Sequence, residues 1–152
     1  MSDIWVTSDT HFGHFNVIRY TGRPFTTVEE MDKALYKNWR ETVKPDDTIF
    51  HLGDVCFKWN KERTASVIAA LPGYKILIMG NHDRRYSPNW WKEVGFNEVY
   101  SKPFIYREKY VLSHEEINLA DYGKSVSFNV FGHIHSNKKD KENGRCVSVE
   151  CT

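Results

Sequence analysis

The segment that decides the fold is KILIMGNHD, residues 75–83. Residues 75–79 are almost all apolar, as expected of a strand that is covered on both faces. The polar residues 80–83 follow directly. Sites in open α/β folds gather beyond the carboxyl ends of the strands, so this segment predicts a buried strand whose polar end contributes to a site.

Two earlier segments have the same form. Residues 4–7 (IWVT) predict a first strand that is followed by Asp9 and His11. Residues 48–52 (TIFHL) predict a second strand, which leads into Asp54. Polar side chains therefore follow three predicted strands in succession.

Two helices are predicted between these strands. A capping-box pattern at Thr26 and Glu29 starts the first helix, and residues 45–47 (PDD) end it. Asn60 can cap the second helix, which stops at residues 71–73 (LPG). The first half of the chain thus predicts the order β-α-β-α-β.

The second half is rich in short strands with little room for helices between them. The candidates are residues 98–100, 104–106, 110–112, 125–131 and 146–149. The charged segment 136–145 contains Asn143-Gly144, a favoured hairpin turn, so we expect it to join the last two strands as a solvated loop.

The two halves together predict one fold class. The 152 residues fit a single compact domain, residues 1–152. The β-α-β-α-β half and the strand-rich half predict an α/β protein with two stacked mixed β-sheets flanked by helices.

Composition and charge limit the partners. Lys and Arg number 21 against 20 Asp and Glu, so no general field attracts nucleic acid or a membrane surface. The three cysteines, Cys56, Cys146 and Cys151, lack CxxC spacing and suggest neither a disulfide framework nor a thiolate zinc site. Without a signal peptide or a long apolar run, the chain is expected in the cytoplasm, away from membranes.

Histidines and acids gather where the predicted strands end. Six of the seven histidines lie there together with four other polar residues: His11, His14, His82, His114, His133, His135, Asp9, Asp54, Asn81 and Asp83. Imidazole, carboxylate and carboxamide groups without a thiolate suit divalent first-row metals. The seventh, His51, lies inside a predicted strand, and we expect it to be structural or to support a ligand from behind.

Each motif alone is also explained by a turn or a core histidine, but their order is specific. The chain presents Asp-x-His, Gly-Asp, Gly-Asn-His-Asp, a single His after an apolar strand, and Gly-His-x-His between residues 9 and 135. This ordered set resembles the calcineurin-like metallophosphoesterase superfamily. Residues 10–16 (THFGHFN) resemble the loop of its small, phage-type branch. The resemblance implies an αββα metallophosphoesterase sandwich, and the short chain leaves little room for a cap domain.

The resemblance also implies a set of metal ligands. One ion would be bound by Asp9, His11 and His135, the second by Asn81, His114 and His133, and Asp54 would bridge the two. Two divalent ions, drawn from Mn, Fe, Ni, Co and Zn, would clamp a phosphoryl group and hold a hydroxide for in-line attack.

Other residues are expected to act on the substrate. By the same resemblance, His82 is the general acid that protonates the leaving oxygen, and Asp83 orients it. The alternative for Asp83 is a cap on the following turn. His14, Arg23 and Arg84 are expected to contact the substrate phosphate, with a plain surface position as the alternative for each.

The implied function is hydrolysis of phosphate esters. Many relatives continue the Gly-Asp block with a further Asp and Arg, whereas this chain continues with Val55-Cys56. We therefore expect phosphodiesters or nucleotide-like substrates rather than phosphomonoesters or phosphoproteins. A set of aromatic side chains is a candidate platform for a base: Phe57, Trp59, Tyr86, Trp90 and Trp91.

Three alternatives remain open. A phosphomonoesterase or a nuclease would use the same site, although near-neutral charge disfavours long nucleic acid. A non-catalytic protein-binding scaffold is the third, and the complete ligand set opposes it. A viral source would place the protein in the host cytoplasm, and the oligomeric state is left open.

Overall fold

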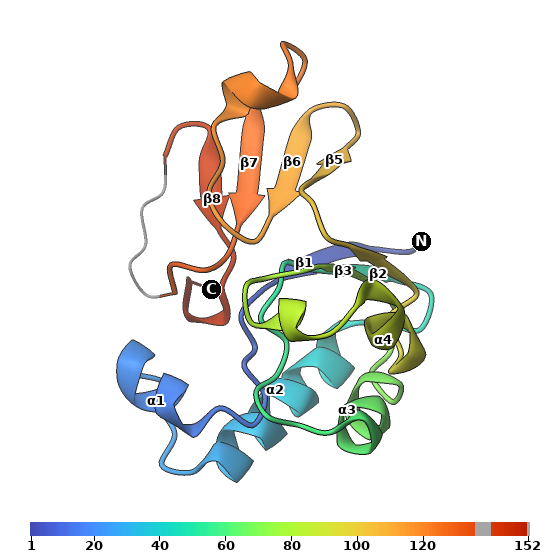
Figure 1. The fold of residues 1–152 in the computed structure, drawn as a ribbon, viewed down its shortest axis with the longest axis vertical. Coiled ribbons are helices and arrows are strands. Elements are labelled where there is room, and N and C mark those ends of the chain that lie inside the picture. The colour runs from blue at the N-terminus through green and yellow to red at the C-terminus, as the bar shows by residue number, and fades with distance from the viewer. Residues whose placement is uncertain (136–140, 152) are drawn as a thin grey trace.

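The computed structural model describes residues 1–135 and 141–151, which form two four-stranded sheets (Figure 1). The first sheet has the order β1-β2-β3-β4, and its neighbouring strands are all parallel. Its strands are β1 (Ile4–Thr7), β2 (Thr48–His51), β3 (Tyr74–Ile78) and β4 (Glu98–Tyr100). The β-α-β-α-β half of the prediction is confirmed.

The second sheet is mixed. Its strands are β5 (Phe104–Tyr106), β6 (Tyr110–Ser113), β7 (Phe128–Phe131) and β8 (Gly144–Cys146). β5 and β6 are antiparallel, whereas β6, β7 and β8 are parallel to their neighbours. The predicted α/β fold with two stacked sheets and helices beside them is confirmed, and no cap domain is evident in the described residues.

The end of the chain departs from the sequence prediction. A two-residue hairpin joins antiparallel strands, but β7 and β8 are parallel, so Asn143-Gly144 does not connect them in that way. These residues lie instead in a local turn, in which the backbones of Lys141 and Gly144 bond to each other. The last strand also begins earlier than predicted, at Gly144. Within the expected loop, residues 136–140 lie outside the described residues.

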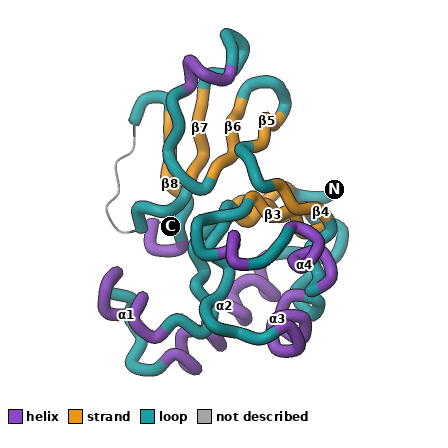
Figure 2. Tube along the Cα trace, in the orientation of Figure 1, coloured by secondary structure: helices purple, strands orange, loops and turns teal. Residues whose placement is uncertain are grey.

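The α-helices lie on the side of the first sheet that faces away from the second sheet (Figures 1 and 2). They are α1 (Phe15–Thr21), α2 (Val28–Thr42), α3 (Lys61–Ile68) and α4 (Pro88–Glu93). Three short 3-10 turns complete the described chain: η1 (Asp83–Arg85), η2 (Leu119–Tyr122) and η3 (Val149–Cys151). No helix among the described residues is long and apolar enough to cross a membrane.

Two helix starts test the capping predictions. Asn60 caps α3 as expected, since its side chain accepts from Arg63 N. The cap of α2 is Thr27 rather than Thr26, because the Thr27 side chain accepts the hydrogen bond from Glu30 N. The sequence analysis also missed α1, a helix of seven residues.

Side-chain alternation along β3 explains its unbroken apolar sequence. Leu77 packs among the side chains of the helices, including the fully buried Trp91 of α4. Ile76 and Ile78 point the other way and pack with Leu112 of the second sheet. Residues of both alternating sets are buried, as a strand between two layers requires.

This packing gives the first prediction. Leu77→Ala should lower the free energy of unfolding by about 2–5 kcal/mol, because it leaves a cavity between β3 and the helices. Urea unfolding measures this loss. The control is Tyr20→Ala, at a side chain that is 77% exposed, which should change stability by less than about 0.5 kcal/mol. Similar losses in both variants would contradict the assigned core.

Candidate metal centre

The first group of candidate ligands is Asp9, His11 and His135. Asp9 and His11 follow β1, and His135 follows β7. Asp9 Oδ1 lies 3.7 Å from His11 Nε2 and 3.7 Å from His135 Nε2. The three side chains thus direct one oxygen and two nitrogens at a common point, in an arrangement able to hold a metal ion.

The second group is Asp54, His114 and His133, with Asn81 beside it. His114 Nε2 lies 3.3 Å from Asp54 Oδ2, 2.9 Å from Asn81 Oδ1 and 3.1 Å from His133 Nδ1. These residues follow β2, β3, β6 and β7, so both sheets contribute.

Asp54 lies between the two groups. Its Oδ2 is 3.5 Å from His11 Nε2 and 3.3 Å from His114 Nε2, while its Oδ1 accepts a hydrogen bond from His82 N. One carboxylate oxygen therefore faces both groups, which is the position that a bridging ligand needs.

Two buried atoms show that the residues fit a cation. Asp9 Oδ1 and His11 Nε2 are buried without a hydrogen-bond partner among the described residues. The other oxygen of Asp9 accepts from the Ser8 and Ser148 hydroxyls and from His133 N. Unpartnered buried polar atoms are unfavourable, and a divalent ion between Oδ1 and Nε2 would satisfy both.

The electrostatics of the site also favour a cation. Burial favours neutral His114, but the hydrogen bond and charge of Asp54 outweigh it and raise the pKa of His114 to about 9. Burial likewise opposes ionisation of Asp9, yet the nearby His11 and His114 rings and the hydrogen bonds from Ser8 and His133 N hold the pKa of Asp9 below the ordinary value. Positive charge is stabilised at this point of the molecule.

Outer hydrogen bonds fix which nitrogen each ligand presents. His114 Nδ1 lies 2.7 Å from Leu52 O, and His135 Nδ1 lies 3.0 Å from Glu150 Oε1. Since a carbonyl and a carboxylate accept, both Nδ1 atoms donate and both Nε2 atoms are turned to the site. Such contacts orient metal-binding histidines and raise their basicity.

Arg23 supports the site from inside the protein, and its contact with substrate stays a prediction. It is buried, and its nitrogens donate to Glu150 Oε1 at 2.7 Å, Thr10 O at 2.7 Å and Asp9 O at 2.5 Å. These bonds turn the guanidinium away from solvent and hold the loop after β1. The sequence analysis missed Glu150, which no motif or spacing marks.

The ligand loops are held in an unusual backbone conformation. Five of the proposed ligands have positive φ: Asp9 (58°), His11 (50°), Asp54 (57°), His133 (68°) and His135 (50°). Residues other than glycine seldom adopt this region, and such strain clusters at functional sites. Asp9 N donates to Gly53 O and His11 N to Asp54 O, so the two loops hold each other.

Asp83 also has a different position from the one predicted. Its carboxylate accepts from Asp54 N at 2.7 Å, Gly80 N at 2.8 Å and Val55 N at 3.0 Å. No bond joins it to the His82 ring among the described residues, so Asp83 neither orients His82 nor caps the turn with its side chain. It fixes the loops that follow β2 and β3.

The rings of His82 and His14 lie beside the ring of His11. The His82 ring is half-buried, makes no hydrogen bond within the described chain, and lies 5.5 Å from the His11 ring between centroids. His14 is buried, with Nδ1 3.0 Å from His11 Nδ1 and its ring stacked on Phe57 at 4.1 Å. Burial lowers the pKa of His14 to about 4. His14 therefore supports the ligand His11, and its contact with substrate stays a prediction.

The expected aromatic platform does not form. Trp59 and Trp91 are buried, and Tyr86 and Trp90 stack on each other at 3.8 Å. Only Phe57 lies beside the site, where its ring is 6.1 Å from that of His82. The aromatic residues are used mainly in packing.

Arg84 is the predicted substrate contact that stays accessible. It is exposed, donates to Ser101 O at 2.8 Å, and lines a hollow of about 240 Å³ together with Asn81, His114 and Lys102. Arg84 therefore lies beside the second group of ligands.

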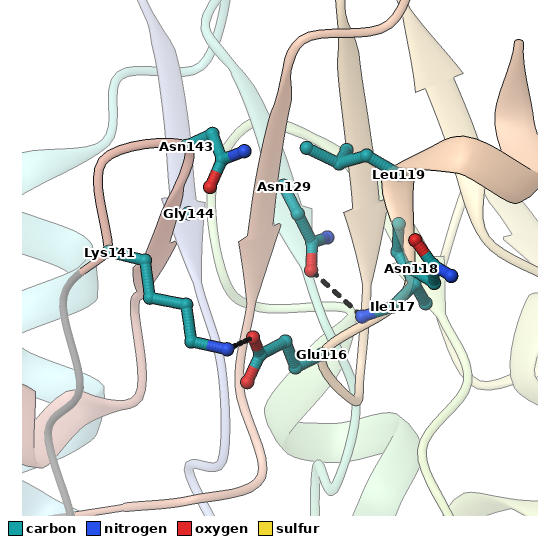
Figure 3. A pocket seen from close by; sticks show the side chains of 8 residues that line it. All are labelled: Glu116, Ile117, Asn118, Leu119, Asn129, Lys141, Asn143 and Gly144. Carbon is teal, nitrogen blue, oxygen red and sulfur yellow. Dashed lines mark hydrogen bonds and ion pairs between the residues drawn. The ribbon is translucent and has the colours of Figure 1, made fainter.

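Two other hollows contain none of the proposed ligands. One, of about 530 Å³, lies beside the second sheet (Figure 3). Lys141 pairs with Glu116 across it, and Asn129 accepts from Ile117 N, so these polar side chains are already bonded. The other, of about 730 Å³, includes Arg23 and Glu150 in its wall. Neither hollow competes with the metal centre as the site of chemistry.

Comparison with known proteins identifies the family. A family model described as calcineurin-like phosphoesterase matches residues 2–146. The chain belongs to this family. Calcineurin-like phosphoesterases depend on two metal ions, and the two groups of ligands described above agree with that requirement.

Individual relatives support the assignment. Uncharacterized protein MJ1445 of Methanocaldococcus jannaschii is 34% identical over 145 residues, which cover 93% of this chain and 74% of that protein. Gene 66 protein of Mycobacterium phage L5 is 38% identical over 91 residues, which cover 59% of this chain and 44% of the phage protein. The crystal structure of AQ665 from Aquifex aeolicus, a protein of unknown function, has a TM-score of 0.72 at 28% identity, covering 97% of this chain and 90% of that one. The resemblance to the family is confirmed, and its relatives include phage proteins.

The role of Glu150 gives the second prediction. Glu150→Gln should weaken Mn²⁺ binding about 10–100-fold, because it removes the charge that orients His135 and raises its basicity. Titration calorimetry measures the affinity. The matched control is Glu62→Gln, at an exposed position on α3, which should bind as the unmodified protein does. Unchanged affinity in the Glu150 variant would remove it from the site.

Proposed function

We propose that this protein hydrolyses phosphate esters with two divalent metal ions, and that phosphodiesters or nucleotide-like molecules are its substrates. The position of Asp54 carries the proposal. Its Oδ2 lies 3.5 Å and 3.3 Å from imidazole nitrogens of two separate ligand groups. Bound ions would clamp the phosphoryl group and lower the pKa of a water, which supplies the nucleophile.

The ligands are assigned from this geometry. Asp9, His11 and His135 would hold one ion, Asn81, His114 and His133 would hold the second, and Asp54 would serve both. Mn, Fe, Ni, Co and Zn all suit these oxygen and nitrogen donors. His11 and His114 are imidazole ligands and add no negative charge to the site. They therefore limit the negative charge that would repel a phosphate.

We assign the general acid to His82. Its ring is half-buried beside the His11 ring and makes no hydrogen bond within the described chain, so its nitrogens are available to a substrate. Its backbone is fixed, because His82 N donates to Asp54 Oδ1. These features support a role in which the ring donates a proton from a nitrogen to the leaving oxygen of the ester.

The charges around the metal centre favour a phosphodiester over a phosphomonoester as substrate. A phosphate monoester carries a second negative charge, which arginine side chains commonly neutralise. Here Arg23 is bonded inside the protein, and Val55 and Cys56 after the bridging acid are buried and uncharged. Of the described residues lining the hollow beside Asn81, Arg84 and Lys102 are the basic ones. A singly charged diester therefore matches these few basic side chains better than a doubly charged monoester does.

The described surface gives little support to a nuclease. Arg107 and Lys109 lie over the rings of Tyr106 and Tyr110 on the second sheet, and Lys141 pairs with Glu116. These residues form no basic stripe that leads to the metal centre through the described chain. Binding to long nucleic acid normally requires such a stripe.

Turnover with added metal is the third prediction. Metal-stripped protein should hydrolyse bis-p-nitrophenyl phosphate faster than p-nitrophenyl phosphate once Mn, Ni, Co or Zn is returned. Release of p-nitrophenol reports the rate. Faster turnover of the monoester would contradict the substrate preference, and no turnover with any metal would favour the protein-binding scaffold.

Separate variants divide metal binding from acid catalysis, which is the fourth prediction. Asp54→Asn should lower both the metal content and the rate, whereas His82→Ala should keep its metal and lose about 10²–10⁴-fold in rate. Elemental analysis and diester hydrolysis measure these effects. Asp121→Asn, at an exposed position in η2, is the control for Asp54→Asn. Equal metal loss in the Asp54 and His82 variants would refute the separate roles.

A further inference from the structure

Two cysteines lie directly behind the first group of ligands. Cys146 Sγ and Cys151 Sγ are 3.0 Å apart and are not joined in a disulfide. A disulfide bond is about 2.05 Å long, so ring closure requires a movement of about 1 Å. The third cysteine, Cys56, lies on another loop and bonds with Thr64 instead.

Both sulfurs connect to proposed ligands through hydrogen bonds. Cys151 Sγ donates to His135 O at 2.8 Å. Cys146 Sγ lies 3.5 Å from the Ser148 hydroxyl, which donates to Asp9 Oδ2 at 2.9 Å. The segment between the cysteines also contains Glu150, which holds His135 Nδ1. Any movement of this segment therefore reaches two ligands of the same group.

We propose that Cys146 and Cys151 are a redox-sensitive pair, and that their oxidation to a disulfide weakens metal binding at Asp9, His11 and His135. The second half of this inference rests on the proposed function. Hydrogen peroxide is the oxidant. The partly exposed Cys151 sulfur attacks one oxygen, which gives a sulfenic acid and water. The buried Cys146 sulfur then attacks the Cys151 sulfur, forms the S–S bond and releases a second water.

The loss of binding follows from the contacts that oxidation removes. The S–H proton that Cys151 donates to His135 O is lost, and its sulfur moves towards β8. His135 has a φ of 50°, a conformation that its surrounding bonds must hold. Glu150, directly before Cys151, is displaced with it and holds His135 Nδ1 less well. Disturbing such outer contacts typically lowers metal affinity about 10–100-fold. We expect a loss near tenfold, the lower end of that range.

The test treats the full chain with hydrogen peroxide and a chelator, removes both, and measures mass and Mn²⁺ affinity. We expect a loss of about 2 Da for one disulfide, and a roughly tenfold weaker affinity that dithiothreitol restores. Cys151→Ser should show neither effect, since its hydroxyl still donates to His135 O but cannot form the bond. Cys56→Ala should show both the mass loss and the weaker affinity, because this variant keeps Cys146 and Cys151.

Two results would overturn the inference. One is the absence of an intramolecular disulfide, with only oxygen added to the sulfurs. The other is a disulfide between these residues that leaves the Mn²⁺ affinity unchanged. Failure of the reduced protein to bind any of Mn²⁺, Ni²⁺, Co²⁺ and Zn²⁺ would refute the metal-binding half and the proposed function together, whereas the mass still decides the pairing of the thiols.

Discussion

Two buried carboxylates, Asp9 and Asp54, impose the main constraint on this structure. Each has an oxygen turned into the protein towards imidazole nitrogens rather than towards water. Burying a charge without compensation is very unfavourable, so the surrounding chain must supply donors or a cation. Ser8, Ser148 and the backbone N–H of His133 supply the donors to Asp9 Oδ2. Asp9 Oδ1 has no such donor among the described residues and would be satisfied by an ion.

The same constraint explains why many residues are used to hold the loops that carry Asp9 and Asp54. Asp83 collects three backbone N–H groups from the loops after β2 and β3 and fixes the approach of Asp54. Gly80 lies so close to that loop that a Cβ atom there would be 2.5 Å from Asp54 Oδ1. On the other side, Arg23 binds the carbonyls of Asp9 and Thr10. The positive φ angles of the ligands persist because these bonds outweigh the local strain.

The sequence predicts the parts of this arrangement that depend on local patterns. The strand β3 and the polar residues after it are adjacent in the chain, and the same holds for Asp9 and Asp54 after their strands. The supporting contacts are not local: Arg23 and Glu150 are 127 residues apart, and each alone looks like a surface charge. The parallel pairing of β7 and β8 is equally hidden, because Asn143-Gly144 indicates a turn without indicating which strands it joins. Residue identity thus predicts the ligands, and only the tertiary structure reveals what holds them.

The origin of the ligands in two different sheets has a consequence for assembly. Asp9, His11, Asp54 and Asn81 come from loops of the first sheet, whereas His114, His133 and His135 come from the second. Neither sheet alone carries a complete group, so a chain whose sheets have not docked has no high-affinity place for an ion. Ions that bind only the docked form stabilise it by mass action. The ability of the two ligand groups to hold an ion is therefore coupled to the docking of the two sheets.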